Sequence, residues 1–164
     1  MILSNVQTID VFVNSAKLND LKILHLSDLH INKKTNLENV QKLVNLCNDL
    51  VFDFCVITGD IIDTKVKFIK EQLQILNTLK FKVYYISGNH DLFYGLEDLK
   101  KELSNFIFMD NSCKEFIYKN ETIFLAGLPD RFSKFFGIKR EEEKIKNYLL
   151  NEPSIFISHQ PKDY

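Results

Sequence analysis

Four short apolar runs, each followed by polar side chains that can bind metal ions, constrain the fold of this 164-residue chain most strongly. The runs cover residues 21–27, 53–58, 83–87 and 154–157. Each has the length of a strand and is bounded by glycine or polar residues. Segments with helical spacing separate the first three runs. We therefore predict an α/β fold with a largely parallel, buried sheet flanked by helices.

The segments between these runs predict the remaining elements. Helices are expected over residues 37–50, 67–79, 96–103 and 139–150. Asn36 is suited to cap the first of these helices. Further strands are expected at 106–109, 115–118 and 122–126. Lys119-Asn120-Glu121 joins the last two as an antiparallel hairpin. No repeat or linker interrupts the pattern, so residues 1–164 are predicted to form a single domain.

The polar clusters that follow the four runs are the main evidence for a functional site. They are Ser27-Asp28-Leu29-His30, Gly59-Asp60-Ile61-Ile62-Asp63, Gly88-Asn89-His90-Asp91 and Ser158-His159-Gln160-Pro161. Ligands of open α/β sheets bind beyond the carboxyl ends of the strands, so we expect these clusters to converge. Carboxylate, imidazole and amide donors without thiolates suit Mn²⁺, Fe or Zn²⁺. Asp60 could bridge two such ions about 3.5–4 Å apart, the spacing that serves in-line phosphoryl displacement by an ionised water.

Some of these residues also have purely structural interpretations. Asp and Asn favour turns, but their repeated coincidence with histidine at successive strand ends argues against turns as the whole explanation. Asp63 could cap the helix that follows, could pair with His90, or could do both. His25 lies inside the first run, where we expect a packed or hydrogen-bonded core histidine rather than a metal ligand.

The aromatic residues near the clusters do not identify the substrate. A first group is expected to serve packing rather than to form a substrate platform: Tyr84, Tyr85, Phe93 and Tyr94. A second group could contact a lipid tail, or could be covered as core or interface: Phe132, Phe135 and Phe136. The loops that would form the walls of a substrate pocket carry no diagnostic pattern.

The motifs, taken in order, resemble those of the calcineurin-like metallophosphoesterases. The series is Asp28-x-His30, Gly59-Asp60-x-x-Asp63, Gly88-Asn89-His90-Asp91 and a later His159. The resemblance runs from about residue 20 to the end of the chain and points to a bacterial subgroup that includes membrane-associated and lipid-pyrophosphate-cleaving enzymes. It implies a four-layer αββα sandwich that hydrolyses a phosphate ester or pyrophosphate at a dinuclear centre of Mn, Fe or Zn.

The resemblance also implies a role for each motif residue. The implied metal ligands are Asp28 and His30 for the first ion, Asn89 and His159 for the second, and Asp60 for both. His90 would be the catalytic general acid, or would stabilise the transition state near the leaving oxygen. Asp63 would orient the imidazole of His90. Asp91 and Gln160 would support the ligands from behind.

The chain departs from the family pattern at its C-terminal end. The family carries a later Gly-His-x-His motif that gives each metal one more histidine, whereas this sequence ends at Tyr164. We therefore expect a sandwich that lacks its C-terminal strands, has an exposed sheet edge and binds metal weakly. The alternative function is a catalytically impaired fragment, or a metal-free scaffold or binding module of the same fold.

Net charge, apolar stretches and cysteine content limit the classes of partner and the location that we expect. A net charge of −1 provides no strongly basic field, so we expect no nucleic-acid partner. No apolar stretch is long enough to span a bilayer, and three cysteines without a CxxC pair fit a reducing compartment. These features favour a cytoplasmic location, to which the resemblance adds peripheral membrane association or a lipid substrate. The expected partner is a phosphorylated substrate, and the oligomeric state stays open.

Overall fold

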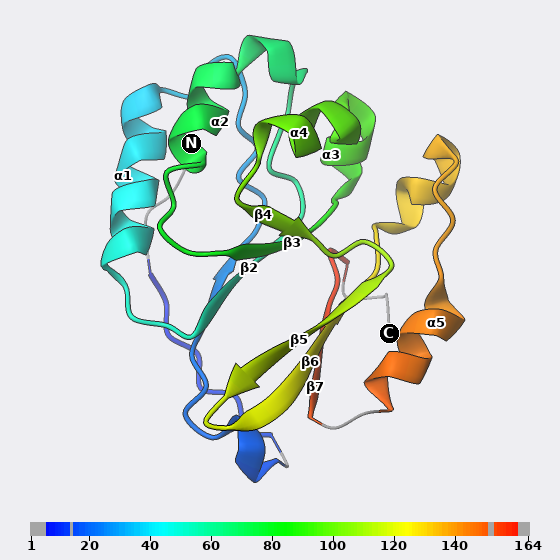
Figure 1. Cartoon of the computed structure of the whole chain (residues 1–164). Coiled ribbons are helices and arrows are strands. Elements are labelled where there is room, and N and C mark those ends of the chain that lie inside the picture. The colour runs from blue at the N-terminus through cyan, green and yellow to red at the C-terminus, as the bar shows by residue number, and fades with distance from the viewer. Residues whose placement is uncertain (1–5, 14, 151–152, 161–164) are drawn as a thin grey trace.

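Two β-sheets pack against each other at the centre of the molecule (Figure 1). The computed structural model of the chain describes residues 6–13, 15–150 and 153–160. The first sheet is parallel, and its strands lie side by side in chain order: β1 (Ile23–Leu26), β2 (Phe54–Thr58), β3 (Val83–Ile86) and β4 (Phe106–Phe108). This sheet confirms the parallel arrangement expected for the first three runs.

The second sheet is mixed. Its strands are β5 (Ser112–Tyr118), β6 (Glu121–Gly127) and β7 (Ser154–Ile157), in that order. β5 and β6 form the predicted antiparallel hairpin, and β7 pairs with β6 in parallel. Lys119 and Asn120, with φ of 48° and 67°, form the connecting turn. Two successive residues with positive φ suit the right-handed twist of a hairpin.

Helices cover the outer faces of both sheets. The α-helices are α1 (Leu37–Asp49), α2 (Lys70–Leu76), α3 (Asn89–Tyr94), α4 (Leu96–Glu102) and α5 (Glu142–Leu149). The short 3₁₀ helices are η1 (Ala16–Leu18), η2 (Val66–Phe68) and η3 (Arg131–Phe136). As predicted, Asn36 caps α1, because its side chain accepts a hydrogen bond from the backbone N–H of Glu38 at 2.9 Å.

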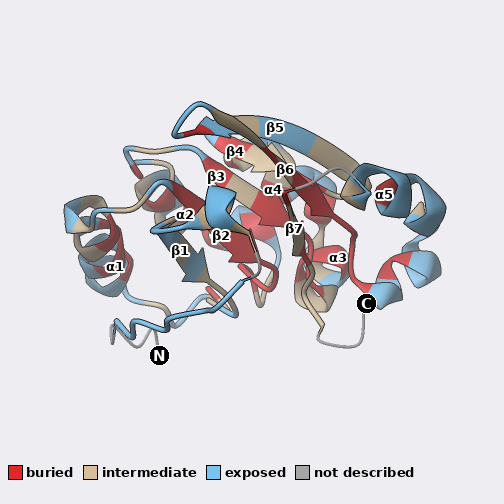
Figure 2. Cartoon of the chain, turned by 90° about the horizontal axis from the view of Figure 1, so that it is seen from below, coloured by how far each residue is buried: buried red, intermediate tan, exposed pale blue. Residues whose placement is uncertain are grey.

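Alternation along the strands divides the core into layers. In β2, Cys55 and Ile57 pack toward the helices, whereas Phe54 and Val56 pack toward the second sheet. In β6, Leu125 faces the first sheet and Ala126 faces Ile145 of α5. Figure 2 shows the buried residues concentrated in the two sheets and on the inner sides of the helices. The layers are therefore helix, sheet, sheet and helix, as the αββα prediction requires.

Several predicted boundaries were wrong. The helix expected over 67–79 begins as η2, breaks at Ile69 and continues as α2 only to Leu76. A separate helix, α3, starts directly after β3 where no helix was predicted. The helix expected over 139–150 is shorter, because α5 begins at Glu142.

One side of the sandwich is open at the edge strands. Within the described ranges, β7 has a strand neighbour on one side only, and the absence of further C-terminal strands stays a prediction. On the same side, Ile23 and His25 of β1 are exposed on the face that continues the inter-sheet surface of β2. Among the described residues, no helix is both long and apolar enough to cross a membrane.

Candidate metal centre

The loops that leave β1 and β2 stay paired beyond the strands and carry the first two motifs side by side. The backbone N–H of Asp28 donates to the carbonyl of Gly59 at 3.1 Å, and that of His30 donates to the carbonyl of Asp60 at 3.0 Å. Ile31 and Ile62 then form a parallel bridge. Because this pairing sets the register of the two loops, the side chains of Asp28, His30 and Asp60 start from neighbouring backbone positions.

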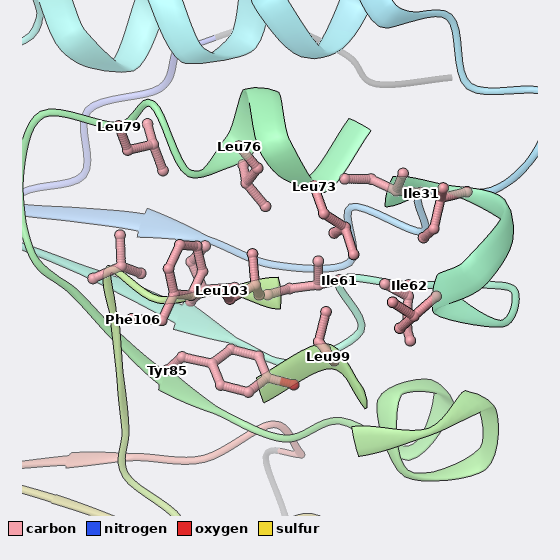
Figure 3. Close-up of a cluster of buried hydrophobic side chains, with 14 of the residues drawn as sticks. Ile31, Ile61, Ile62, Leu73, Leu76, Leu79, Tyr85, Leu99, Leu103 and Phe106 are labelled. Atoms are coloured by element: carbon pink, nitrogen blue, oxygen red, sulfur yellow. The ribbon is translucent and has the colours of Figure 1, made fainter. Parts of the chain in front are cut away.

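Buried isoleucines anchor these loops in the core. Ile31, Ile61 and Ile62 are fully buried, and Figure 3 shows them in the same cluster as Leu73 and Leu99. Each isoleucine is adjacent in sequence to a motif residue. The buried isoleucines therefore fix the positions of the neighbouring motif residues, whose polar side chains lie outside the hydrophobic core.

Two glycines allow the loops after β2 and β3 to touch. A Cβ on Gly59, whose φ is 92°, would lie 2.7 Å from the Cα of Gly88 and 2.7 Å from Nδ1 of His159. A Cβ on Gly88 would lie 2.1 Å from Oδ1 of Asp60. Only residues without a side chain fit at this contact. The glycines of the second and third motifs are therefore explained by the close approach of the site residues.

Three motif residues hold backbone conformations that side chains rarely adopt. Asp28, His30 and Asp60 have φ of 54°, 44° and 55°. A non-glycine residue with positive φ is uncommon, and such strain gathers at functional sites where the surrounding structure enforces it. Here the paired loops supply that enforcement and turn the three side chains toward one point.

Donor atoms from all four segments meet around the carboxylate of Asp60, which is almost fully buried. Its Oδ2 lies 3.8 Å from Nε2 of His30 and 3.5 Å from Nε2 of His159. Nε2 of His30 lies 3.6 Å from Oδ1 of Asp28, whose other oxygen accepts a hydrogen bond from Ser27. Two donors bonded to one ion at about 2.1 Å lie roughly 3 to 4 Å apart. These separations therefore fit divalent metal ions.

The hydrogen bond at Nδ1 of His159 orients the other nitrogen of that ring. Nδ1 lies 2.6 Å from the carbonyl oxygen of Thr58, which can only accept, so Nδ1 carries the proton. In the neutral ring, Nε2 then has a lone pair, and it faces Oδ2 of Asp60 and Oδ1 of Asn89, the latter at 3.2 Å. In that form of the ring, three electron pairs would converge with no hydrogen between them. A cation at that point satisfies all three.

His90 and Asp63 form a pair beside these donors. Nδ1 of His90 lies 2.9 Å from Oδ1 of Asp63, so the carboxylate holds the ring by its Nδ1–H. The rings of His30 and His90 are 4.6 Å apart, edge to face. His30, Asp63 and His90 also lie close enough to form a metal-binding group, as do Asp28, Asp60 and His159. Because Asp63 already binds His90, its position fits the predicted role of a partner to that histidine.

Asp91 ties the loop after β2 to the loop after β3 from below. Its carboxylate accepts hydrogen bonds from the backbone N–H groups of Asp60 at 2.7 Å, Gly88 at 3.0 Å and Ile62 at 3.1 Å. The hydroxyl of Tyr85 donates a fourth at 2.7 Å. Burial raises the pKa of Asp91 to about 6, although these hydrogen bonds act to lower it. Asp91 thus supports the ligands from behind, as predicted.

The structure brings together all seven residues predicted for the site: Asp28, His30, Asp60, Asp63, Asn89, His90 and His159. It also corrects the predicted environment of another residue. His25 is hydrogen-bonded as expected, with Nε2 2.7 Å from Oγ1 of Thr58, but the prediction that it lies in the core was wrong. For Gln160, the described contact is its backbone carbonyl, which accepts from the Ser158 hydroxyl at 3.1 Å. The supporting role of the Gln160 side chain stays a prediction.

Sequence reasoning missed two contributors. The carbonyl of Thr58 orients His159, and the hydroxyl of Ser27 binds Asp28. A backbone carbonyl carries no residue signature, so the sequence offers no signal for the first. The serine directly before Asp28 was visible, but its direction depends on the positive φ of Asp28.

Comparisons with known proteins give a family match and individual relatives. The calcineurin-like phosphoesterase family matches residues 21–164. A metallophosphoesterase of Campylobacter jejuni is 31% identical over 96% of this chain and 42% of its own length. One from Helicobacter pylori is 29% identical over 87% of this chain and 39% of its own length. The chain thus spans about two fifths of the length of these curated relatives.

A solved structure supports the fold. NAD nucleotidase of Haemophilus influenzae superposes with a TM-score of 0.52 at 19% identity, over 70% of this chain and 27% of that one. At this identity the likeness concerns the fold alone. The family assignment rests on the match over residues 21–164. The chain belongs to the calcineurin-like phosphoesterase family.

Proposed function

We propose that this chain hydrolyses a phosphate ester or pyrophosphate at two divalent ions, Mn, Fe or Zn, held by its motif residues. The ligands would be Asp28, His30, Asp60, Asn89 and His159. The observation that carries the proposal is the meeting of three donor atoms, on Asp60, Asn89 and His159. The chain spans about two fifths of the length of these curated relatives. The same hydrolytic activity is therefore also only proposed for any longer protein that contains this chain.

The protein groups divide the work around the bound phosphate. When bound, the two ions would supply Lewis acidity toward the phosphoryl oxygens and toward the attacking water. Asp60 has one carboxylate oxygen facing His30 and His159, and the other accepts from the backbone N–H of His90 at 2.9 Å. Asp60 therefore links the metal-binding loops to the start of α3, where His90 lies.

His90 is suited to give a proton to the leaving oxygen. Its Nδ1 binds Asp63 at 2.9 Å, so Nε2 is the nitrogen that can act on substrate. Asp63 also fixes the orientation of the imidazole ring of His90. The departing alkoxide would take that proton as the bond from phosphorus to oxygen breaks.

Calorimetric titration with Mn²⁺ tests the metal site, and a hydrolysis assay tests the reaction. We expect the chain to bind Mn²⁺, and we expect Asp60→Asn, which removes the shared oxygen charge, to abolish the heat. We also expect slow hydrolysis of an aryl phosphate ester that EDTA stops and added Mn²⁺ restores. Equal heats for the wild type and Asp60→Asn would retire the metal centre and favour a metal-free scaffold.

A further inference from the structure

A hollow walled by aromatic side chains opens directly beside the proposed catalytic group. It has a volume of about 290 Å³ and lies between α3 and η3. Its lining comprises Asn89, His90, Phe93, Tyr94, Phe132 and Phe136. The first two are residues of the candidate metal centre, and the other four are aromatic. The hollow is therefore continuous with the site.

The 3₁₀ helix η3 buries polar side chains and exposes aromatic ones, the reverse of the usual arrangement. Asp130, which caps this helix by accepting from the N–H of Phe132 at 2.7 Å, is fully buried, and so is Ser133. Phe132 and Phe136, in contrast, are 49% and 44% exposed. A helix that stabilises its own domain buries its apolar face. Since η3 turns that face outward, packing among the described residues does not account for Phe132 and Phe136.

Phe93 on α3 shows the same inversion from the opposite wall. Its side chain is 70% exposed, so packing in the core does not explain it, whereas Tyr85 is fully buried, in keeping with the packing role predicted for this group. Phe93 packs edge to face on Tyr94, with ring centroids 5.0 Å apart, and Tyr94 lies 6.0 Å from the ring of His90. The row of rings thus leads from solvent to the proposed proton donor.

These observations identify what the hollow holds. Exposed apolar patches mark ligand sites or interfaces, and this one includes Asn89 and His90, so its occupant must also reach the phosphate. Resting on the proposed function, we propose that the hollow between α3 and η3 binds the organic group of the substrate next to the scissile bond. The chain would then act on phosphate esters whose alcohol carries an aromatic ring or a compact apolar group.

The size of the hollow limits that group. Pockets for small molecules begin at roughly 300 Å³, so this one holds a single ring system or a short branched chain beside the phosphate. Apolar contact on both walls favours a flat group between Phe93 and Phe132. A substrate whose alcohol is small and polar would leave both rings exposed and would gain nothing from them.

A binding experiment with two phosphonates tests the proposal without requiring turnover. Phenylphosphonate and methylphosphonate share the charged group and differ in the ring. In the presence of Mn²⁺, we expect calorimetry to show that phenylphosphonate binds about tenfold more tightly than methylphosphonate. The reason is that the phenyl ring buries apolar surface against the partly exposed walls of the hollow. Phe132→Ala should cut the advantage to about twofold. Phe68→Ala is the matched control, because Phe68 is 48% exposed on η2 outside the hollow, and it should keep the tenfold advantage.

The outcomes separate the two proposals. Equal affinity for the two phosphonates in the wild type, or an advantage unchanged by Phe132→Ala, would overturn the aromatic pocket while leaving the metal centre intact. Failure of both phosphonates to bind in the presence of Mn²⁺ would overturn the proposed function and the pocket with it. Analytical ultracentrifugation tests whether a second copy of the chain occupies the hollow instead. A dimer that Phe132→Ala dissociates without changing the phosphonate ratio would make the patch an interface between copies and overturn the proposal.

Discussion

The carboxylate of Asp91 accepts a hydrogen bond from the backbone N–H of Asp60 at 2.7 Å, inside the core and below the proposed metal centre. The same carboxylate binds the N–H groups of Gly88 and Ile62 and the hydroxyl of Tyr85. One buried acid thus ties the loop after β2 to the loop after β3. The spacing of ligands that lie on different loops depends on a residue that is not itself a ligand.

Replacing Asp91 with Asn should destabilise the fold by about 2 kcal/mol. The amide has one oxygen and one N–H₂ group, so the N–H₂ group must face a backbone N–H, such as that of Ile62, which loses its acceptor. Urea denaturation would measure the change as a lower midpoint at an unchanged slope. Asp98→Asn is the control, since Asp98 is exposed on α4 and pairs with Lys101 at 3.2 Å. It should cost less than about 0.5 kcal/mol.

Replacing Gly88 with Ala should disrupt the site more than it unfolds the chain. The new Cβ would lie 2.1 Å from Oδ1 and 2.4 Å from the backbone N of Asp60, so the loops must separate. We expect a loss of about 1–3 kcal/mol in stability, together with the loss of Mn²⁺ binding. Calorimetry and denaturation on the same samples would measure both.

Gly137→Ala provides the control for that experiment. Unlike Gly88, whose φ is −93°, Gly137 has a positive φ of 73°, and a Cβ there would meet nothing within 4 Å. It should cost about 1 kcal/mol of backbone strain and leave Mn²⁺ binding unchanged. Equal Mn²⁺ affinities for the two variants would show that the contact between Gly88 and Asp60 does not govern the site.

Much of this site could be predicted from the sequence, because its ligands follow buried strands. Runs of apolar residues locate β1, β2, β3 and β7, and in parallel strands the residues after each run emerge at one edge. The chain supplied a signal for α3 as well, which was overlooked. Asp91, three residues after Gly88, accepts from the N–H of Gly88 at 3.0 Å, as an acidic residue does in the first turn of a helix.

Other features lay beyond sequence patterns. The burial of Asp130 and Ser133 beneath η3, and the exposure of Phe132, depend on which side of a six-residue helix meets the body. Hydrophobic periodicity predicts the opposite arrangement, since it assigns apolar residues to the interior. The exposed face of β1 at His25 likewise depends on the order of strands in the second sheet. Such reversals between pattern and burial are expected where function competes with packing.

His159→Ala should weaken Mn²⁺ binding strongly, whereas His25→Ala should leave it nearly unchanged. His159 presents Nε2 to Asp60 and Asn89, while the side-chain hydrogen bond described for His25 is to the hydroxyl of Thr58. Removing a ligand should cost at least the 10–100-fold that loss of a supporting partner costs. His25→Ala should change the dissociation constant by less than about threefold. The reverse ranking in a calorimetric titration would show that the second ion is held elsewhere.

His90→Gln should separate catalysis from metal binding. Because His90 is assigned the proton transfer and no metal, its loss should lower kcat by about 10²–10⁴-fold while the Mn²⁺ affinity stays close to that of the wild type. Asp63→Asn keeps the imidazole but weakens its orientation through the 2.9 Å contact, and should lower kcat by about 10–100-fold.

The double variant decides whether Asp63 acts through His90. If it does, adding Asp63→Asn to His90→Gln should cause no further loss, since residues that act as a unit are not additive. Steady-state rates on an aryl phosphate ester, with Mn²⁺ affinity from calorimetry on the same proteins, would measure both properties. Losses that multiply in the double variant, or a collapse of Mn²⁺ affinity in His90→Gln, would instead place His30, Asp63 and His90 around an ion, as their mutual distances also allow.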